Sequence, residues 1–256
     1  MAIHIKTVEE IKKMRAAGEV AAKVLDEMSH FATVGVSTYD LDRFGKDVMS
    51  KLGAKSASYH YGFPKNPYPG YSCISINDEV VHGIPSKEVF LNDGDIVSID
   101  VAVFYNGYVG DNTRTVRIGK VSDEAERLAK VTEEALLLGI GQAVAGNKIG
   151  DISHAIEMHA LKHKFGVLKD YVGHGVGKRM HEDPQVPNYG KPGTGSILRP
   201  GMTLAIEPMF TYGSEKVYVA ENGWTVKTVD GSLAAHCEHT ILITDNLPEI
   251  LTLVKK

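Results

Sequence analysis

Hydrophobic residues recur at three- and four-residue steps in several stretches of the chain, which is the period of a helix that buries one face. The pattern predicts helices over residues 7–31, 122–145 and 151–165, and another that begins at residues 37–40, STYD, a sequence typical of a capping box. The expected buried stripes are Ile11, Met14, Gly18, Ala21, Leu25 and Met28 in the first helix, Leu41, Phe44, Val48 and Leu52 in the second, and Leu128, Val131, Ala135 and Leu138 in the third.

Shorter apolar runs, bounded by turn residues, predict strands. They lie near residues 72–76, 202–210, 216–220, 224–229 and 235–244. The strongest signal is residues 96–115, IVSIDVAVFYNGYVGDNTRT, where Asn106 and Gly107 suit the two-residue turn of a hairpin, because both turn residues need positive φ. Residues 59–71 and 187–201 are rich in Pro and Gly and are predicted loops.

The hairpin predicts which side chains share a face. Its two-residue turn places Asp100 opposite Thr113 and Ala102 opposite Asp111. Asp100 and Asp111 are then diagonal neighbours on one face, roughly 7–8 Å apart. Carboxylates among apolar residues are costly to bury unless a cation pairs with them, and this spacing suits two metal ions about 3.5–4 Å apart. The alternative is that one of the two aspartates faces solvent and is structural.

The second half of the chain repeats the first. Residues 91–100, LNDGDIVSID, match residues 198–207, LRPGMTLAIE, and the last residue of each copy is acidic. Upstream of each copy, His82-Gly-Ile-Pro matches His181-Glu-Asp-Pro. Two copies are too few for a solenoid and suggest two related α+β halves around one shared sheet. The acids and histidines would then face a common cleft.

The repeat yields a set of candidate metal ligands, to which a glycine-rich segment, GHGVG, adds an imidazole. They are Asp100, Asp111, Glu207, Glu238 and His174. An oxygen-rich set with one imidazole suits ions such as Mn²⁺, Fe²⁺ or Co²⁺ and excludes a thiolate-rich zinc site. Two ions held in this way lower the pKa of water and give hydroxide at neutral pH.

Other catalytic patterns, including G-x-S-x-G, H-E-x-x-H and C-x-x-C, are absent from the sequence. His159 and His163 have the i,i+4 spacing of a metal pair, and we interpret them, with His154, as surface histidines. Cys73 with His82 is conceivable as a thiol nucleophile pair, but nothing marks the thiol as activated, and a pocket-lining thiol is the better interpretation.

Composition narrows the function further. The 256 residues are 43% hydrophobic and 23% charged, and the net charge of −4 does not suggest a nucleic-acid partner. No apolar run is long enough to span a bilayer, and the N-terminus lacks the apolar core of a signal peptide. We therefore expect no membrane association, two reduced cysteines and a cytoplasmic location.

Several segments carry a family resemblance. SIDVAV, GYVGDNTRT, GHGVG, MHEDPQVPNYG, LRPGMTLAIEP and EHT occur in this order and resemble methionine aminopeptidase of the pita-bread metallopeptidases over nearly the whole chain. The short interval between Glu207 and Glu238 is similar to type 1 enzymes. The resemblance implies an α+β pita-bread fold in a single catalytic domain, residues 1–256. Pseudo-symmetric halves, about 1–120 and 121–256, would share a curved, mostly antiparallel sheet backed by helices.

The resemblance also implies a reaction. Two divalent ions, Co, Mn, Fe or Zn, would support removal of the N-terminal methionine from nascent proteins whose second residue is small. Asp111 and Glu238 would bridge both ions, Asp100 would complete one site, and His174 with Glu207 would complete the other. Glu207 would also shuttle protons.

The resemblance assigns substrate contacts as well. His181 would bind the scissile carbonyl oxygen as charge develops on it, and His82 would hydrogen-bond the substrate amide or the leaving amine. The methionine pocket would be lined by Phe63, Cys73, Met180 and Trp224. Three departures from the family affect the shape of that pocket: residues 66–70 look inserted, Met180 replaces an expected aromatic residue, and Val81 stands where a Cys is common.

Two alternatives stay open at this point. One is a proline-directed peptidase of the aminopeptidase P or prolidase type, which usually carries an additional N-terminal domain that we do not expect in this chain. The other is a non-enzymatic binding protein on the same fold, against which the full ligand set argues. Nascent polypeptide N-termini are the expected partners of a monomer. The sequence leaves ribosome binding and the choice of metal open.

Overall fold

The expected helices form close to their predicted bounds within residues 3–254, which a computed structural model of the chain describes. They are α1 (Val8–Phe31), α2 (Thr38–Lys51), α3 (Asp123–Gln142) and α4 (Ile149–Lys162). The strands are β1 (Lys55–Ser56), β2 (Gly62–Phe63), β3 (Asn66–Pro67), β4 (Cys73–Ile76), β5 (Glu79–Val81), β6 (Ile96–Tyr105), β7 (Tyr108–Arg117), β8 (Gly166–Val167), β9 (Gly173–Gly175), β10 (Glu182–Val186), β11 (Thr203–Ile206), β12 (Met209–Thr211), β13 (Val217–Val219), β14 (Val226–Thr228), β15 (Ala234–His236), β16 (Glu238–Leu242) and β17 (Glu249–Ile250).

The helix starts follow from side-chain capping. At α1, the Thr7 hydroxyl accepts from the Glu10 N–H and the Glu10 carboxylate accepts from the Thr7 N–H, which satisfies two end groups at once. At α2, the Ser37 hydroxyl accepts from the Asp40 N–H (3.0 Å). Both starts were predicted from sequence.

The predicted stripe of α3 is wrong at one position. Leu128, Val131 and Ala135 are buried, but Leu138 is 47% exposed. The centre of the buried face is instead Gly139, where α4 approaches so closely that an added Cβ would lie 2.9 Å from the side chain of Ile156. Leu138 lies one residue earlier, past the edge of this face, because each helical residue turns by about 100°.

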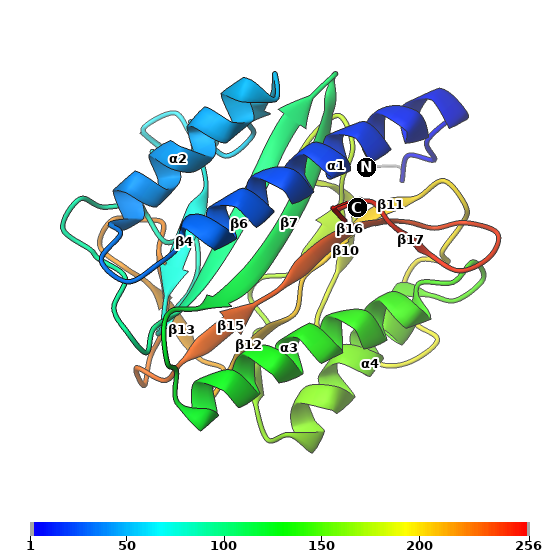
Figure 1. Cartoon of the computed structure of the whole chain (residues 1–256). Coiled ribbons are helices and arrows are strands. Elements are labelled where there is room, and N and C mark those ends of the chain that lie inside the picture. Colours follow the sequence, from blue (N-terminus) through cyan, green and yellow to red (C-terminus); the bar gives the residue numbers. More distant parts are fainter. Residues whose placement is uncertain (1–2, 255–256) are drawn as a thin grey trace.

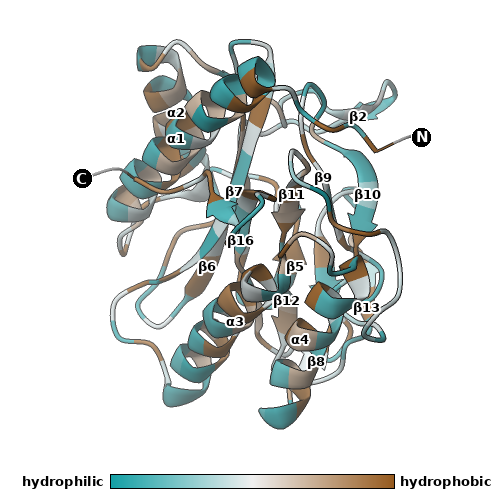
Figure 2. Ribbon diagram, turned by 90° about the vertical axis from the view of Figure 1, so that its right-hand side faces the viewer, coloured by the Kyte–Doolittle hydropathy of each residue, from teal (hydrophilic) through white to brown (hydrophobic). Residues whose placement is uncertain are grey.

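A nine-stranded antiparallel sheet organises the molecule, with the order β1-β6-β7-β16-β11-β9-β10, to which β4 and β17 add beside β6 and β16. Helix α1 crosses the β6–β7 hairpin, and α3 and α4 lie side by side (Figure 1). Strands β11 and β12 are mostly hydrophobic, whereas the helices carry both kinds of residue, as expected for a buried sheet covered by amphipathic helices (Figure 2). No helix among residues 3–254 is both long and apolar enough to cross a membrane.

Each helix pair buries its own hydrophobic cluster against this sheet. The cluster under α1 and α2 includes Leu25, Leu41 and Ile99. The cluster under α3 and α4 includes Leu128 and Ile152, which pack with strand residues of the second half. The side chains in both clusters are nearly inaccessible to water, so burial of apolar surface holds the helices to the sheet.

The repeated segments have matching backbone surroundings. In each half, a glycine with positive φ after the first helix donates to the carbonyl of the leucine that begins the repeat, and the glycine inside the repeat donates to a distant isoleucine. The pairs are Gly35 with Leu91 (2.8 Å), Gly146 with Leu198 (3.0 Å), Gly94 with Ile118 (2.8 Å) and Gly201 with Ile243 (2.9 Å).

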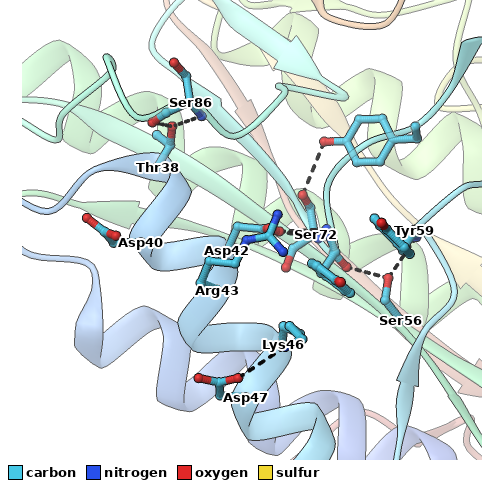
Figure 3. A network of polar contacts seen from close by, with 12 residues as sticks. Thr38, Asp40, Asp42, Arg43, Lys46, Asp47, Ser56, Tyr59, Ser72 and Ser86 are labelled. Carbon is cyan, nitrogen blue, oxygen red and sulfur yellow. Dashed lines mark hydrogen bonds and ion pairs between the residues drawn. The ribbon is translucent and has the colours of Figure 1, made fainter.

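A buried carboxylate on α2 anchors the segment that leads into β4. Oδ1 of Asp42 accepts from the backbone N–H groups of Tyr71 (2.8 Å) and Ser72 (2.9 Å). The Ser56 hydroxyl donates to the Tyr71 carbonyl (2.7 Å) and accepts from the Tyr59 N–H (2.9 Å). Figure 3 shows this network between α2 and the loop. It ties both ends of residues 59–71 to the scaffold.

Replacing Asp42 with Asn should remove a pH-dependent part of the stability. Burial raises the pKa of Asp42 to about 6, against the opposing effect of the hydrogen bonds from Ser72 and Tyr71. Because this pKa exceeds the unfolded value, ionisation weakens the folded state. The free energy of unfolding of the unaltered chain, relative to Asp42→Asn, should therefore fall by up to about 3 kcal/mol as the pH rises from about 4 to about 6.

Urea unfolding across this pH range measures the difference. Asp47→Asn is the matched control, because Asp47 lies on the same helix and its side chain is 66% exposed. A pH-independent difference between the unaltered chain and Asp42→Asn would contradict the assignment.

Candidate metal centre and active site

The β6–β7 hairpin has the predicted register. Asn106 and Gly107 form the turn with φ of 50° and 84°. Asp100 lies opposite Thr113, and Ala102 lies opposite Asp111. Both aspartates therefore share one face of the sheet, and both line the same cavity.

Neighbouring strands bring the remaining acids to that face. Glu238 begins β16 and lies opposite Thr113 of β7. Glu207 follows the last residue of β11 and precedes Pro208, which separates β11 from β12. The predicted strand at 202–210 is thus two strands, as is the predicted strand at 235–244, which breaks at Cys237. The Cys237 N–H donates to the Pro208 carbonyl (3.3 Å), so the two interruptions lie together beside the cavity.

His174 is the fifth member of the cluster. It lies on β9 and pairs with Ala205 of β11. Ligand atoms of Asp111, His174 and Glu238 all lie within 4.8 Å of one another, and the three residues are buried. Nε2 of His174 lies 3.4 Å from Oε1 of Glu207. The structure therefore brings together all five residues expected to hold metal.

The His174 ring is fixed in the orientation that a ligand needs. Its Nδ1 lies 2.9 Å from the Gly175 carbonyl, which can only accept, so Nδ1 carries the proton. The lone pair is then on Nε2, which faces the acids. A backbone partner of this kind is typical for a metal-binding histidine.

The pKa values of all four acids are raised. Burial is the main cause that raises the pKa values of Asp111, Glu207 and Glu238 well above the usual range, and the neighbouring carboxylates add to it. Burial also raises the pKa of Asp100. A desolvated imidazole beside them, His174, has its pKa lowered to about 3. Without added positive charge, these carboxylates cannot all ionise together.

The residues fit divalent ions. Oε2 of Glu238 accepts from the Thr113 hydroxyl (3.0 Å), whereas its Oε1 is buried and has no hydrogen-bond partner within residues 3–254. An orphaned carboxylate oxygen in a cluster of acids is costly unless a cation binds it. Carboxylate oxygens with one neutral imidazole are ligands of Mn²⁺, Fe²⁺, Co²⁺ and Zn²⁺.

A second imidazole next to Glu207 was missed from sequence. His236, 3% exposed, lies on β15 with Nε2 3.5 Å from Oε2 of Glu207. Burial lowers its pKa to about 4. Its place two residues before Glu238, on the alternation of a strand, was the available signal.

The two predicted substrate-binding histidines approach the acids from opposite repeats. The ring of His181 lies 4.3 Å from that of His174, edge to face. The ring of His82 packs edge to face against Tyr171 (5.5 Å) and lies 6.1 Å from Trp224. Burial lowers the pKa of both, that of His82 to about 4. Both are therefore neutral near pH 7.

Tyr61 contacts His181 directly and was not singled out from sequence. Its hydroxyl lies 2.5 Å from Nδ1 of His181. Burial raises the pKa of the phenol, so it keeps its proton at neutral pH. Tyr61 belongs to the aromatic loop 59–71, whose importance for the cleft only the fold reveals.

Three of the four residues predicted to line the methionine pocket lie in the same cavity as the acids. Cys73, Met180 and Trp224 line the same cavity. Cys73 lies opposite Asp100 in the β4–β6 register, and burial raises the pKa of its thiol, which favours a pocket-lining role over a nucleophilic one. Phe63 belongs to β2, but its side chain lies outside the described part of the structure.

Residues 66–70 form part of the cavity wall. Trp224 Nε1 donates to the Asn66 carbonyl (3.1 Å). The Tyr68 ring packs edge to face on Trp224 at 5.3 Å, and its hydroxyl donates to the Gly83 carbonyl (2.7 Å). Tyr68 is 2% exposed and lines the cavity. Residues 66–70 therefore contribute an aromatic side chain to the pocket.

Comparisons with known proteins identify the family of the chain. Residues 12–245 match the model of metallopeptidase family M24. The chain is 50% identical to methionine aminopeptidase of Clostridium acetobutylicum over 98% of this chain and 99% of that protein. It is 45% identical to methionine aminopeptidase of Escherichia coli over 100% of this chain and 96% of that protein.

Solved structures show the same fold. The crystal structure of methionine aminopeptidase from Thermotoga maritima superposes with a TM-score of 0.95 at 47% identity, covering 98% of this chain and 100% of that one. Prolidase from Pyrococcus furiosus gives a TM-score of 0.76 at 25% identity, and the match covers 66% of its chain. The predicted α+β pita-bread architecture is confirmed. The chain belongs to metallopeptidase family M24.

Proposed function

We propose that the chain is a divalent-metal-dependent aminopeptidase that removes an N-terminal methionine when the second residue is small. The observation that carries this proposal is the cluster of four carboxylates and His174, of which Asp111, Glu238 and His174 are buried, in a cavity also lined by Cys73, Met180, Tyr68 and Trp224. Relatives that match over 96–99% of their length are named methionine aminopeptidases, whereas likeness to prolidase is weaker. We infer that the substrates are the N-termini of nascent proteins.

The ligands would divide as the family resemblance implies. Asp111 and Glu238 would bridge two ions, Asp100 would complete one site, and His174 with Glu207 the other. Divalent ions at this position supply Lewis acidity and lower the pKa of water toward neutral. This division is supported by the proximity of Asp111 and Glu238, whose ligand atoms lie within 4.8 Å of each other and of one from His174.

Glu207 suits proton transfer. Its two oxygens lie 3.4 Å from His174 and 3.5 Å from His236, and both imidazoles are desolvated and neutral. A carboxylate in this position can act as a general base toward a water molecule bound beside it. Glu207 would take a proton from the attacking water and pass it to the leaving amine.

His181 would donate to the scissile carbonyl oxygen. When the Tyr61 hydroxyl donates to Nδ1, the ring proton of His181 is on Nε2. Nε2 can then donate to an oxygen on which negative charge develops, and this contact strengthens in the transition state. His82, which lines the same cavity, would bind the substrate amide or the leaving amine.

Peptide cleavage tests the substrate. A thioether packs well against aromatic edges and soft atoms, so methionine suits walls built from Trp224, Tyr68, Met180 and Cys73. A difference of one methylene group in the substrate side chain changes the discrimination between two substrates by only about 1–3 kcal/mol. We expect Met-Ala-Ser and norleucine-Ala-Ser to be cleaved, and Ala-Ala-Ser and Met-Lys-Ser hardly at all. Equal kcat/KM for Met and Ala at the first position would refute the pocket. Efficient cleavage of an Ala-Pro peptide would favour a proline-directed enzyme.

Exhaustive chelation should abolish activity while the circular dichroism spectrum stays unchanged, because the strands and their apolar clusters do not depend on the ions. Re-addition of Mn²⁺ or Co²⁺ should restore activity and release protons, since the pKa values of Asp111, Glu207 and Glu238 are raised. Asp111→Asn should weaken binding of both ions, measured by calorimetry in buffers of different ionisation enthalpy. Glu124→Gln, on the first turn of α3, is the control. Activity in verified metal-free protein would exclude this mechanism.

Two substitutions test the Tyr61–His181 pair. His181→Ala should lower kcat by about 10²–10³ and change KM little, because its contact strengthens only as charge develops. Tyr61→Phe keeps the ring but removes the hydrogen bond, and should lower kcat by roughly 2- to 10-fold. Adding Tyr61→Phe to His181→Ala should cause no further loss. Additive effects in the double variant would show that Tyr61 acts independently of His181.

A further inference from the structure

We propose that Glu134, His159 and His163 form a separate binding site for one late first-row divalent ion, such as Zn²⁺, Ni²⁺ or Cu²⁺. Glu134 belongs to α3, His159 to the last turn of α4, and His163 is the C-cap of α4. One ligand atom from each residue lies within 4.8 Å of the other two. None of the three lines the cavity that holds the five catalytic ligands.

The distances suit a common ion. Nε2 of His159 lies 3.1 Å from Oε2 of Glu134, and the imidazole rings of His159 and His163 are 4.8 Å apart between centroids. Ligand atoms bound at about 2.0–2.1 Å in a tetrahedral site are about 3.3 Å apart. Small rotations of the two imidazoles therefore bring all three atoms to binding distance. The residues are partly exposed, so an ion can reach them from solvent.

The backbone that carries these ligands is already in place. The spacing of four residues puts His159 and His163 on one face at the end of α4. Helices α3 and α4 are locked together by the close contact between Gly139 and Ile156. A further hydrogen bond ties the helices at the site itself, because Arg127 of α3 donates to the His163 carbonyl (3.2 Å). The arrangement needs side-chain movement only.

The donor types select the ion. Two imidazoles and one carboxylate favour Zn²⁺, Ni²⁺ and Cu²⁺ over Mg²⁺ and Ca²⁺, which prefer oxygen ligands. Glu134 supplies negative charge among nearby cations that include Arg127 and Lys162. The His163 ring contacts His159 but makes no hydrogen bond to another residue in the described range 3–254, so its free nitrogen remains available.

An ion at this site would join the end of α4 to the middle of α3. It would also add one equivalent of metal beyond those bound at the catalytic cluster. Both effects are measurable without an activity assay, so they are independent of the proposed reaction. The simpler interpretation, in which His159 and Glu134 form only a hydrogen bond between helices, predicts neither effect.

Zn²⁺ binding to the full chain, measured by calorimetry and by metal analysis after gel filtration, tests the proposal. His159→Ala/His163→Ala should bind one equivalent fewer than the unaltered chain and should lose part of the Zn²⁺-dependent rise in Tm. His154→Ala is the matched control, because His154 lies on the same helix but outside the ligand set. It should bind as many ions as the unaltered chain.

Glu134→Gln keeps the side-chain shape and should lower the affinity for the additional Zn²⁺ ion at least roughly tenfold. Loss of a residue that only hydrogen-bonds a metal ligand can already cause a decrease of this size. Electron paramagnetic resonance of the unaltered chain with Cu²⁺ should show coupling to two nitrogens for this equivalent, which provides a result even if a variant fails to fold. Equal stoichiometry in the double-histidine variant and the unaltered chain would overturn the proposal. Loss of the same equivalent in His154→Ala, or a Cu²⁺ spectrum without two-nitrogen coupling, would also overturn it.

Discussion

Repulsion among four carboxylates, two of them buried and two partly buried, is the constraint on which the functional part of this fold depends. Asp100, Asp111, Glu207 and Glu238 meet at one face of the nine-stranded sheet, where burial raises the pKa values of all four. In the unfolded chain, water would solvate each of these carboxylates. In the folded chain, each is held in place by strands whose other residues belong to a hydrophobic cluster. The apolar clusters thus supply the stability that lets the sheet keep like charges close together.

Strand register converts this constraint into a defined geometry. A shift of one residue in β7 would turn Asp111 from the cavity to the opposite face. The turn at Asn106 and Gly107 prevents such a shift, because both residues adopt positive φ and fix the pairing of the hairpin. Gly110 lets α1 approach β7 so closely that an added Cβ would lie 2.4 Å from the Ala17 carbonyl. Helix packing and ligand placement therefore depend on the same ten-residue strand.

The loops around the acids set what enters the cavity. Residues 59–71 bring Tyr61 to His181 and Tyr68 to Trp224, and their ends are held by Asp42 and Ser56. These contacts join segments from both halves of the chain across the cleft. Substrate selection and histidine orientation thus depend on a loop whose anchor is a buried carboxylate on α2.

The sequence by itself determined the features that local periodicity and repetition encode. The hairpin register followed from a two-residue turn, and the start of α2 followed from its capping residue. The five candidate ligands followed from the repeat, the glycine-rich segment around His174 and the family resemblance. Only the tertiary structure decided which distant side chains meet. Glu134 lies on a different helix from His159 and His163, Tyr61 is 120 residues from His181, and Leu138 faces solvent because Gly139 is the point where α4 packs. The physical reason is that short-range backbone preferences act within a few residues, whereas these contacts arise when helices and loops pack against the finished sheet.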